Sequence, residues 1–471
     1  MEMIYQPYID PEFESLMERI YPPRVCLDND ACQGCTLVKV DSANKHGILL
    51  EMVQVLTDLD LVIPKSYISS DGGWFMDVFH VTDQAGNKLT DESLMLYIQQ
   101  ALCPSKSKEI QKTRMGRELR SRHVSTENTV LEMTGTDRPG LMSEMSAVLL
   151  ELGCTVTSAV AWTHNTRVAC IIQVEDAFKG GPITDPVRLA DMEAQLENVV
   201  EAHHVNGERR SVRLTVPVAG QTHTERRLHQ LMYADRDYER CHGCDGGDKH
   251  KKGHDGTRAT IESCEEKGYS VVNVKSRDRP KLLFDTLCAL TDMEYEVFHA
   301  VVASKGSMAD QEYFIRHKDG CTLDTQSERH KLTQCLIAAV ERRVSHGLRL
   351  EICTHNRMGL LADMTRVLRE NGLSISRVEV GIQGERAVGS FYITDAAGHD
   401  VKPDIVEVVK KETGGSVIAV QKSPAWGPQG TPSRTARSTN RSIEDRPRLS
   451  LGSLLWSQIE RLSGNFGPIR S

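Results

Sequence analysis

The sequence repeats one short pattern four times, and this repetition limits the possible folds more than any other feature. In each copy a strand-like run leads through a polar turn directly into a helical pattern. The strand-like runs are residues 37–40, 130–133, 271–274 and 348–352. The turns read Asn-Lys-His-Gly at 44–47, Asp-Arg-Pro-Gly at 137–140, Asp-Arg-Pro-Lys at 278–281 and Asn-Arg-Met-Gly at 356–359. Repetition of this kind indicates that each copy is one structural unit.

The helical pattern after the turn keeps one frame in all copies. Its apolar residues recur at spacings that lie on one face of an α-helix: Ile48, Met52, Val55 and Leu56 in copy one, Leu141, Met145, Val148 and Leu149 in copy two, and Leu360, Met364, Val367 and Leu368 in copy four. Copy three keeps the frame more weakly, with Leu282, Thr286, Ala289 and Leu290. An acidic residue recurs in the first helical turns, where negative charge complements the helix dipole: Glu51, Glu144, Asp285 and Asp363.

Two further strand-like runs follow in each copy, joined by a turn that contains Gly or Asn. These residues tolerate the positive φ angles of tight hairpins. A second helical pattern comes next, as at 91–102 and 186–200, and usually a closing strand, as at 416–420. This order predicts an α+β protein of four tandem ferredoxin-like βαββαβ modules. The predicted bounds are residues 34–120, 128–218, 269–345 and 347–423, with an N-terminal segment at 1–33, a linker or insert at 219–268 and a tail with an amphipathic helix at 424–471.

The spacing of the copies suggests how the modules pair. The insert separates copies one and two from copies three and four, and it begins with a charged helical pattern at 224–239. Almost no linker lies between Val344 and Leu348, which favours pairing of copies three and four. We therefore expect module pairs within the chain, joined edge to edge so that edge strands are covered. A homodimer is an alternative way to cover them.

Composition excludes several classes of protein. Charged residues make up 26% and hydrophobic residues 39%, as in ordinary globular proteins, and the net charge of −8 argues against nucleic-acid binding. Thirteen scattered cysteines favour a reducing compartment. No run approaches the roughly 18 apolar residues of a membrane span, and the first residues lack the features of a signal peptide. We expect a cytoplasmic protein, with the nucleus as an alternative.

A βαββαβ unit with an Asp/Asn-Arg-x-Gly turn after its first strand resembles the ACT domain. Residues 44–51, 69–79, 223–230 and 278–285 resemble the plant ACT-repeat (ACR) proteins, which consist almost wholly of four ACT modules. The resemblance covers roughly residues 20–425. It implies a non-catalytic regulatory protein that binds amino acids at the turn and at module interfaces and signals nitrogen or amino-acid status, without a cofactor. The ACT tail of a bacterial uridylyltransferase is related, but the nucleotidyltransferase motif of that enzyme is absent here.

The turns have features that suit an amino-acid ligand. The first amides of a helix lack intrahelical partners and attract a carboxylate. Glycine permits close approach, and Asn or Asp there either caps the helix or accepts a hydrogen bond from an ammonium group. Lys281, where the other copies have Gly, either obstructs a ligand or pairs with its carboxylate. The predicted binding residues are Asn44, His46, Gly47, Ile48, Asp137, Pro139, Gly140, Leu141, Asp278, Lys281, Leu282, Asn356, Met358, Gly359 and Leu360.

Two other functions fit parts of the sequence. A metal-dependent enzyme would use Cys241 and Cys244 with His250 and His254, or with the distant CxxC at 32–35, but unpaired CxxC motifs are weak zinc signals and we predict no metal site. An interaction scaffold without ligand would recruit a protein partner through the C-terminal tail. Residues 106–122 are basic and helix-prone, which favours a solvated linker face over an anionic partner.

Overall fold

The computed structural model describes residues 24–70, 73–103, 128–202, 209–216, 223–239, 256–264, 268–344, 347–414 and 416–422. Within these ranges the first helix of every module begins at the residue that the sequence pattern predicts. The first strands and first helices are β2 (Thr36–Ala43) and α2 (Ile48–Asp58), β5 (Thr129–Thr136) and α4 (Leu141–Glu151), β10 (Tyr269–Arg277) and α7 (Leu282–Asp292), and β13 (Leu348–His355) and α9 (Leu360–Glu370).

A hairpin and a second helix follow in each module, as predicted. The hairpins are β3 (Val62–Ser69) with β4 (Trp74–Thr82), β6 (Cys154–His164) with β7 (Arg167–Asp176), β11 (Tyr295–Lys305) with β12 (Met308–His317), and β14 (Leu373–Gln383) with β15 (Arg386–Asp395). The second helices are α3 (Glu92–Ala101), α5 (Pro186–Glu201), α8 (Gln326–Glu341) and α10 (Pro403–Glu412). The turn residues Asn165, Gly306 and Gly384 have positive φ angles, which explains the choice of Asn and Gly. The ferredoxin-like α+β fold is confirmed.

The strand that closes each module comes from two different places in the chain. Modules 2 and 4 are closed, as predicted, by the strands after their second helices, β8 (Ser211–Thr215) and β16 (Val417–Lys422). In modules 1 and 3 the same edge is covered from the N-terminal side, by β1 (Arg24–Asp28) and β9 (Arg258–Cys264). These two strands lie outside the predicted module bounds, inside the segments 1–33 and 219–268. An antiparallel strand from either side satisfies the edge of the first strand equally well.

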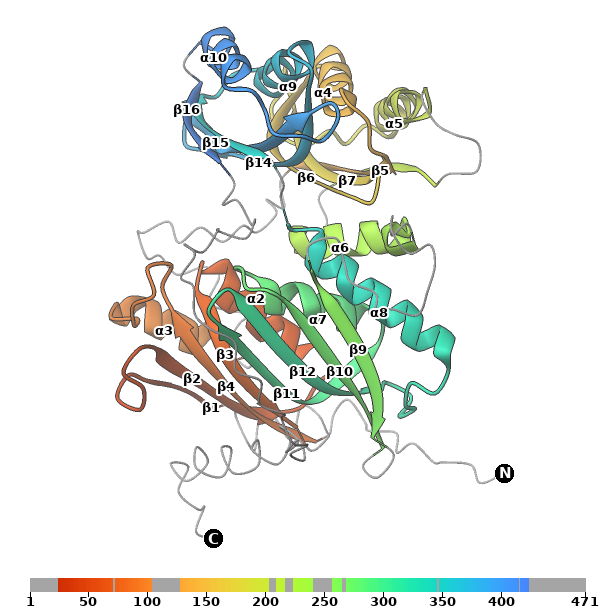
Figure 1. The fold of residues 1–471 in the computed structure, drawn as a ribbon. Helices are drawn as coiled ribbons and strands as arrows, with labels where there is room; N and C mark the ends of the chain where they lie inside the picture. Colours follow the sequence, from red (N-terminus) through yellow and green to blue (C-terminus); the bar gives the residue numbers. More distant parts are fainter. Residues whose placement is uncertain are drawn as a thin grey trace, which may run out of the picture.

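The modules pair within the chain, but not as neighbours in sequence. One eight-stranded sheet has the order β1-β2-β4-β3-β11-β12-β10-β9 and joins modules 1 and 3. The other has the order β16-β13-β15-β14-β6-β7-β5-β8 and joins modules 4 and 2 (Figure 1). The predicted pairing of copies three and four is therefore wrong. A short connector fixes only where module 4 starts, whereas the partner is set by the antiparallel contacts of β3 with β11 and of β6 with β14. We call the two halves double module 1·3 and double module 2·4, and the junction within each a seam.

Each double module has one continuous hydrophobic core between its sheet and its helices. The first helices of paired modules pack against each other, α2 on α7 and α4 on α9. At the centre of the second contact, the buried hydroxyls of Ser146 and Thr365 are 2.9 Å apart. The first-helix turns are thus brought to the seams.

The predicted helix of the insert lies between the two double modules. It forms α6 (Thr224–Ala234), followed by the short helix η3 (Asp237–Glu239). Figure 1 shows α6 between the sheet of double module 2·4 and the helices of double module 1·3. Its apolar side chains Leu228 and Met232 pack with Trp162 on the sheet face that α4 and α9 leave uncovered. The insert is therefore a structural layer as well as a linker.

Candidate ligand-binding site

The first helices of the four modules begin in the same unusual way. The residue before each helix has a left-handed backbone, with φ of 84° at Gly47, 86° at Gly140, 63° at Lys281 and 77° at Gly359. No side chain in the described part of the chain caps these four helices. By contrast, side chains of Asp91, Asp185 and Thr325 cap α3, α5 and α8. The uncapped amides remain suited to a carboxylate.

The Asn or Asp at the start of each turn serves a purpose other than the predicted cap. Its backbone N–H donates to a carbonyl of the module's own hairpin turn. The bonds are Asn44 to Gly73 at 3.0 Å, Asp137 to Thr166 at 2.8 Å, Asp278 to Ser307 at 2.9 Å and Asn356 to Glu385 at 2.8 Å. The capping alternative is therefore wrong in all four copies. These residues fasten the turn to the hairpin. The first amides of α2, α4 and α9 donate to the carbonyls of Lys45, Arg138 and Arg357, and no side chain among the described residues caps the amides that follow them.

The arginine of the turn and the acidic residue of the helix form a pair that the sequence did not reveal. Nη1 of Arg138 is 3.0 Å from Oε1 of Glu144. The Nη1–Oδ2 distances are 2.6 Å both for Arg279 with Asp285 and for Arg357 with Asp363. The acid in the first helical turns therefore orients the turn in copies two to four, besides complementing the helix dipole. Copy one has Lys45 at the arginine position.

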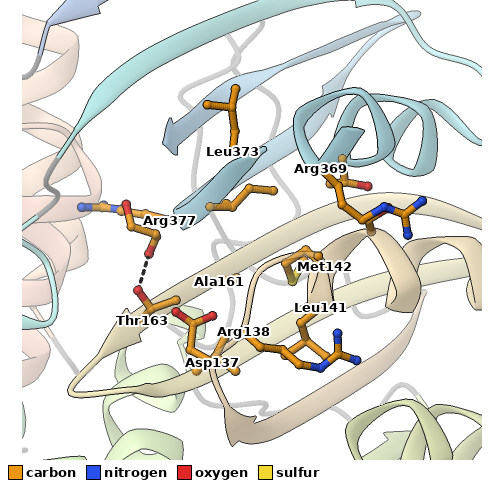
Figure 2. Close-up of a pocket in the computed structure, with 15 residues that line it drawn as sticks. Asp137, Arg138, Leu141, Met142, Ala161, Thr163, Arg369, Leu373 and Arg377 are labelled. Atoms are coloured by element: carbon orange, nitrogen blue, oxygen red, sulfur yellow. Dashed lines mark hydrogen bonds between the residues drawn. The ribbon is translucent and has the colours of Figure 1, made fainter. Parts of the chain in front are cut away.

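The second turn lines a small cavity at the seam of double module 2·4 (Figure 2). Its volume is about 20 Å³, little more than the roughly 10–15 Å³ that one water needs. Module 2 contributes the start of α4 and module 4 contributes α9 and β14. The lining includes Asp137, Gly140, Leu141, Met142, Ser143 and Thr163 from module 2 and Arg369, Leu373, Ser376 and Arg377 from module 4. The hydroxyl of Thr163 donates to the Ser376 carbonyl across the seam at 3.1 Å.

Charge in this cavity suits a zwitterion. Arg369 reaches over the turn, and a Cβ atom at residue 140 would lie 2.9 Å from its Cδ, so glycine is needed for this approach. Loss of solvent around Asp137 raises the pKa of its carboxyl to about 6. Figure 2 shows Asp137 and Arg369 apart from each other in the pocket. A cation near the α4 amides and a separate carboxylate match the two ends of an amino acid.

The fourth turn lines the related cavity on the other side of the same seam, with a volume of about 30 Å³. Asn356, Gly359 and Leu360 contribute from module 4, and Leu150 and Thr157 from module 2. A Cβ atom at residue 359 would be 3.1 Å from a methyl of Leu150. Both cavities of this seam are therefore tight in the structure.

The third turn lines a far larger cavity, of about 200 Å³, at the seam of double module 1·3. Apolar side chains of Leu61, Ile63, Leu282 and Val302 surround it. The ammonium of Lys281 donates to both carboxylate oxygens of Glu225 on α6, at 2.8 and 2.9 Å. Its charge is thus matched by a carboxylate of the chain itself. The sequence alternatives for this lysine were obstruction of a ligand and pairing with the ligand carboxylate, and neither included this ion pair.

The first turn differs from the others. Gly47 faces Thr291 of module 3, whose methyl would be 3.9 Å from a Cβ at residue 47. His46 lies across the seam from Glu296, with 3.7 Å between Nδ1 and Oε1, and both side chains are substantially exposed. This turn contacts its partner module without the arginine that organises the other three.

The remaining predicted residues fall into two groups. Leu141, Leu282 and Leu360 are buried and line their cavities, while Ile48 packs against the core. Pro139 and Met358 are exposed at the surface of their turns. Sequence reasoning missed Thr163, Arg369 and Arg377. Two of these belong to the partner module, and only knowledge of the pairing would have identified them.

The described ranges contain no group of three or more His, Cys, Asp and Glu residues placed to hold a metal. Cys241, Cys244, His250 and His254, the basic segment 106–122 and the tail lie outside the described residues. Within the described ranges no helix is long and apolar enough to cross a membrane.

Comparison with known proteins agrees with this geometry. The ACT domain model matches residues 348–414, and the model of the ACR family N-terminal ACT domain matches residues 31–109. The four modules thus define a protein of repeated ACT domains. The chain is 57% identical to the ACT domain-containing protein ACR1 of Arabidopsis thaliana, over 98% of each chain. It is 52% identical to ACR3 of the same plant, over 89% of this chain and 91% of ACR3. The chain belongs to the ACR family of ACT domain-containing proteins.

A bifunctional uridylyltransferase/uridylyl-removing enzyme of Azospirillum brasilense is more distantly similar. It is 37% identical over 81 residues, which are 17% of this chain and 9% of the enzyme. The similarity is therefore confined to a stretch about one module long.

Proposed function

We propose that this chain is a non-catalytic regulatory protein of the cytoplasm that binds an amino acid at the seams between paired ACT modules and thereby signals amino-acid or nitrogen status. The observation that carries the proposal is the start of the first helices. All four are uncapped, all four begin with a left-handed residue, and three of these turns line a cavity at a seam. Such helix starts favour a carboxylate.

The second turn offers the most complete set of ligand contacts. The amides of Met142 and Ser143 at the start of α4 and the guanidinium of Arg369 would receive the ligand carboxylate, and Asp137 would accept a hydrogen bond from its ammonium group. Leu141 and Leu373 would contact the side chain. The equivalent contacts at the fourth turn lack an aspartate, since Asn356 stands there.

The tight cavities of double module 2·4 give the proposal a mechanism. A cavity of about 20 Å³ has no room for an amino acid, so the ligand would bind a form in which the seam is wider. A ligand that favours one form shifts the population towards it. Arg377 links this seam to double module 1·3, because it lines the cavity and donates to the carbonyl of Arg343 at 2.9 Å. Binding at one seam would therefore alter the junction of the two halves.

The proposal is tested by thermal denaturation of the full chain with each common amino acid, followed by calorimetry on every hit. A ligand that binds only the folded chain raises the Tm progressively with its concentration. Gly140→Ala should reduce the shift, because the added Cβ meets Arg369 and the φ of 86° is unfavourable for alanine.

Gly86→Ala is the matched control. Its φ is 82° and no atom lies within 4 Å of an added Cβ, so it has the same backbone strain away from the seam. Its ligand-induced shift should equal that of the native chain. If no amino acid raises the Tm of the native chain, the binding proposal is wrong, and the alternative of an interaction scaffold takes its place.

A further inference from the structure

The loop between β1 and β2 contains a pair of cysteines in direct contact. Cys35 lies immediately before β2, and its Sγ is 3.1 Å from the Sγ of Cys32. The two sulfurs differ in access, since Cys35 is only 6% exposed whereas Cys32 is partly open to solvent. The amino-acid hypothesis leaves this pair without a role, and the described ranges hold no group of His, Cys, Asp and Glu residues that would bind a metal together with it.

Hydrogen bonds hold the loop in place around the two sulfurs. The Asp28 carboxylate accepts from the amides of Asp30 and Ala31 at 2.9 and 3.0 Å. The Asn29 side chain accepts from the Thr36 hydroxyl at 2.6 Å and donates to the Leu89 carbonyl at 2.9 Å. Asn29 therefore anchors the start of the loop both to β2 and to the segment before α3. The contact between the sulfurs is a feature of a fixed loop.

The surroundings shift the pKa values of the two thiols in opposite directions. The hydrogen bond from Cys35 lowers the pKa of the Cys32 thiol, helped by the backbone amide of Gly34 and the ammonium of Lys88. Burial, and then the neighbouring Cys32, raise the pKa of Cys35 to about 12. A more acidic, accessible thiol beside a buried protonated one suits a nucleophile and its resolving partner.

We propose that Cys32 and Cys35 form a reversible redox site whose oxidant is a low-molecular-weight disulfide of the glutathione class. The Cys32 thiolate attacks one sulfur of glutathione disulfide, forms a mixed disulfide and releases one glutathione thiolate. Cys35 then loses its proton and attacks the Cys32 sulfur, which expels the second glutathione thiolate. The products are the Cys32–Cys35 disulfide and two molecules of glutathione. This site is independent of amino-acid binding at the seams.

The test uses the reduced full chain equilibrated with mixtures of glutathione and glutathione disulfide. After an acid quench, free thiols are blocked with N-ethylmaleimide and the peptide that contains both cysteines is weighed by mass spectrometry. The native peptide should lose two hydrogen atoms and regain them with dithiothreitol. Cys35→Ser should retain one glutathione on Cys32, because the resolving thiol is missing. Cys32→Ser should leave the buried Cys35 unmodified.

Cys26 provides the control, because it is exposed on β1 of the same hairpin. Cys26→Ser should leave the Cys32–Cys35 disulfide unchanged. A second measurement needs no variant: on the native chain at neutral pH, iodoacetamide should alkylate Cys32 faster than Cys26. The proposal is overturned if Cys32 reacts no faster than Cys26. It is equally overturned if Cys32 of the native chain keeps its glutathione instead of forming the disulfide. The same holds if Cys32 and Cys35 stay free in a mixture that glutathionylates Cys26.

Discussion

At the scale of single residues, Asp137 shows how far a local pattern predicts a role. Its position before α4 is typical of a helix cap, yet its amide donates to Thr166 and its carboxyl faces the seam cavity. Burial raises the pKa of this carboxyl to about 6, so the folded chain binds a proton there more strongly than the unfolded chain does. The stabilising contribution of that proton is fully present below about pH 4, the usual pKa of Asp, and is lost as the pH rises through about 6.

Asp137→Asn should therefore change how stability depends on pH. Asparagine has the same shape and no charge to desolvate, so the variant should match the native chain near pH 4 and exceed it by about 1–3 kcal/mol at pH 8. Urea denaturation at a series of pH values measures the difference. Asp30→Asn, in the exposed loop after β1, serves as the control and should keep the native pH profile. If the stability of D137N depends on pH in parallel with that of the native chain, the pKa of the Asp137 carboxyl is not raised in the folded chain.

Local signals explain which site residues were predictable. The turns, the helix starts and the positions of Gly47, Gly140 and Gly359 follow from residues a few places apart in the sequence. Arg369 and Arg377 were missed, because they reach the second turn only after module 4 pairs with module 2. That contact joins strands more than 200 residues apart, and no local periodicity encodes it.

At the scale of elements, the sequence of α6 predicts a solvent-exposed helix, whereas the structure buries it. It reads as a charged helix in a linker, yet Glu225, Leu228 and His229 are buried between the double modules. Glu225 receives hydrogen bonds from Lys281 and, at 3.2 Å, from Arg343. Burial alone would raise the pKa of Glu225, but Arg343 and Lys281 hold it below its usual range. His229 lies 2.9 Å from Asp285, which Arg343 also contacts, so one ionic network joins α6, α7 and the end of α8.

Glu225→Gln should destabilise the chain substantially. Removal of one partner from a buried ion pair leaves uncompensated charge and costs about 3 kcal/mol or more, here for Lys281 and Arg343 together. Glu239→Gln is the matched control, because its exposed pair with Arg236 should contribute less than about 1 kcal/mol. Urea denaturation of both variants gives the comparison. Equal, small losses would mean that the network adds nothing to stability.

At the scale of the whole molecule, the two halves of the sequence are interleaved. Each sheet takes four strands from the chain before residue 240 and four from the chain after residue 255. The first of these regions also supplies α6, whose partners Lys281 and Asp285 belong to the second. Neither half of the sequence contains a complete double module. The short connector after Val344 suggested that modules 3 and 4 pair with each other. That prediction failed because proximity in sequence carries no information about which strand edges match.

This interleaving predicts the behaviour of a chain divided within the insert, between residues 240 and 256. The two co-expressed fragments should assemble one to one, because β3 needs β11 and β6 needs β14. Alone, each fragment would expose two inner strands as open edges, which promote aggregation. With an affinity tag on one fragment only, copurification followed by light scattering should give the mass of the intact chain. Pairing of modules 1 with 2 and 3 with 4 would instead yield two separately folded fragments that do not bind each other. That result would exclude the topology described here.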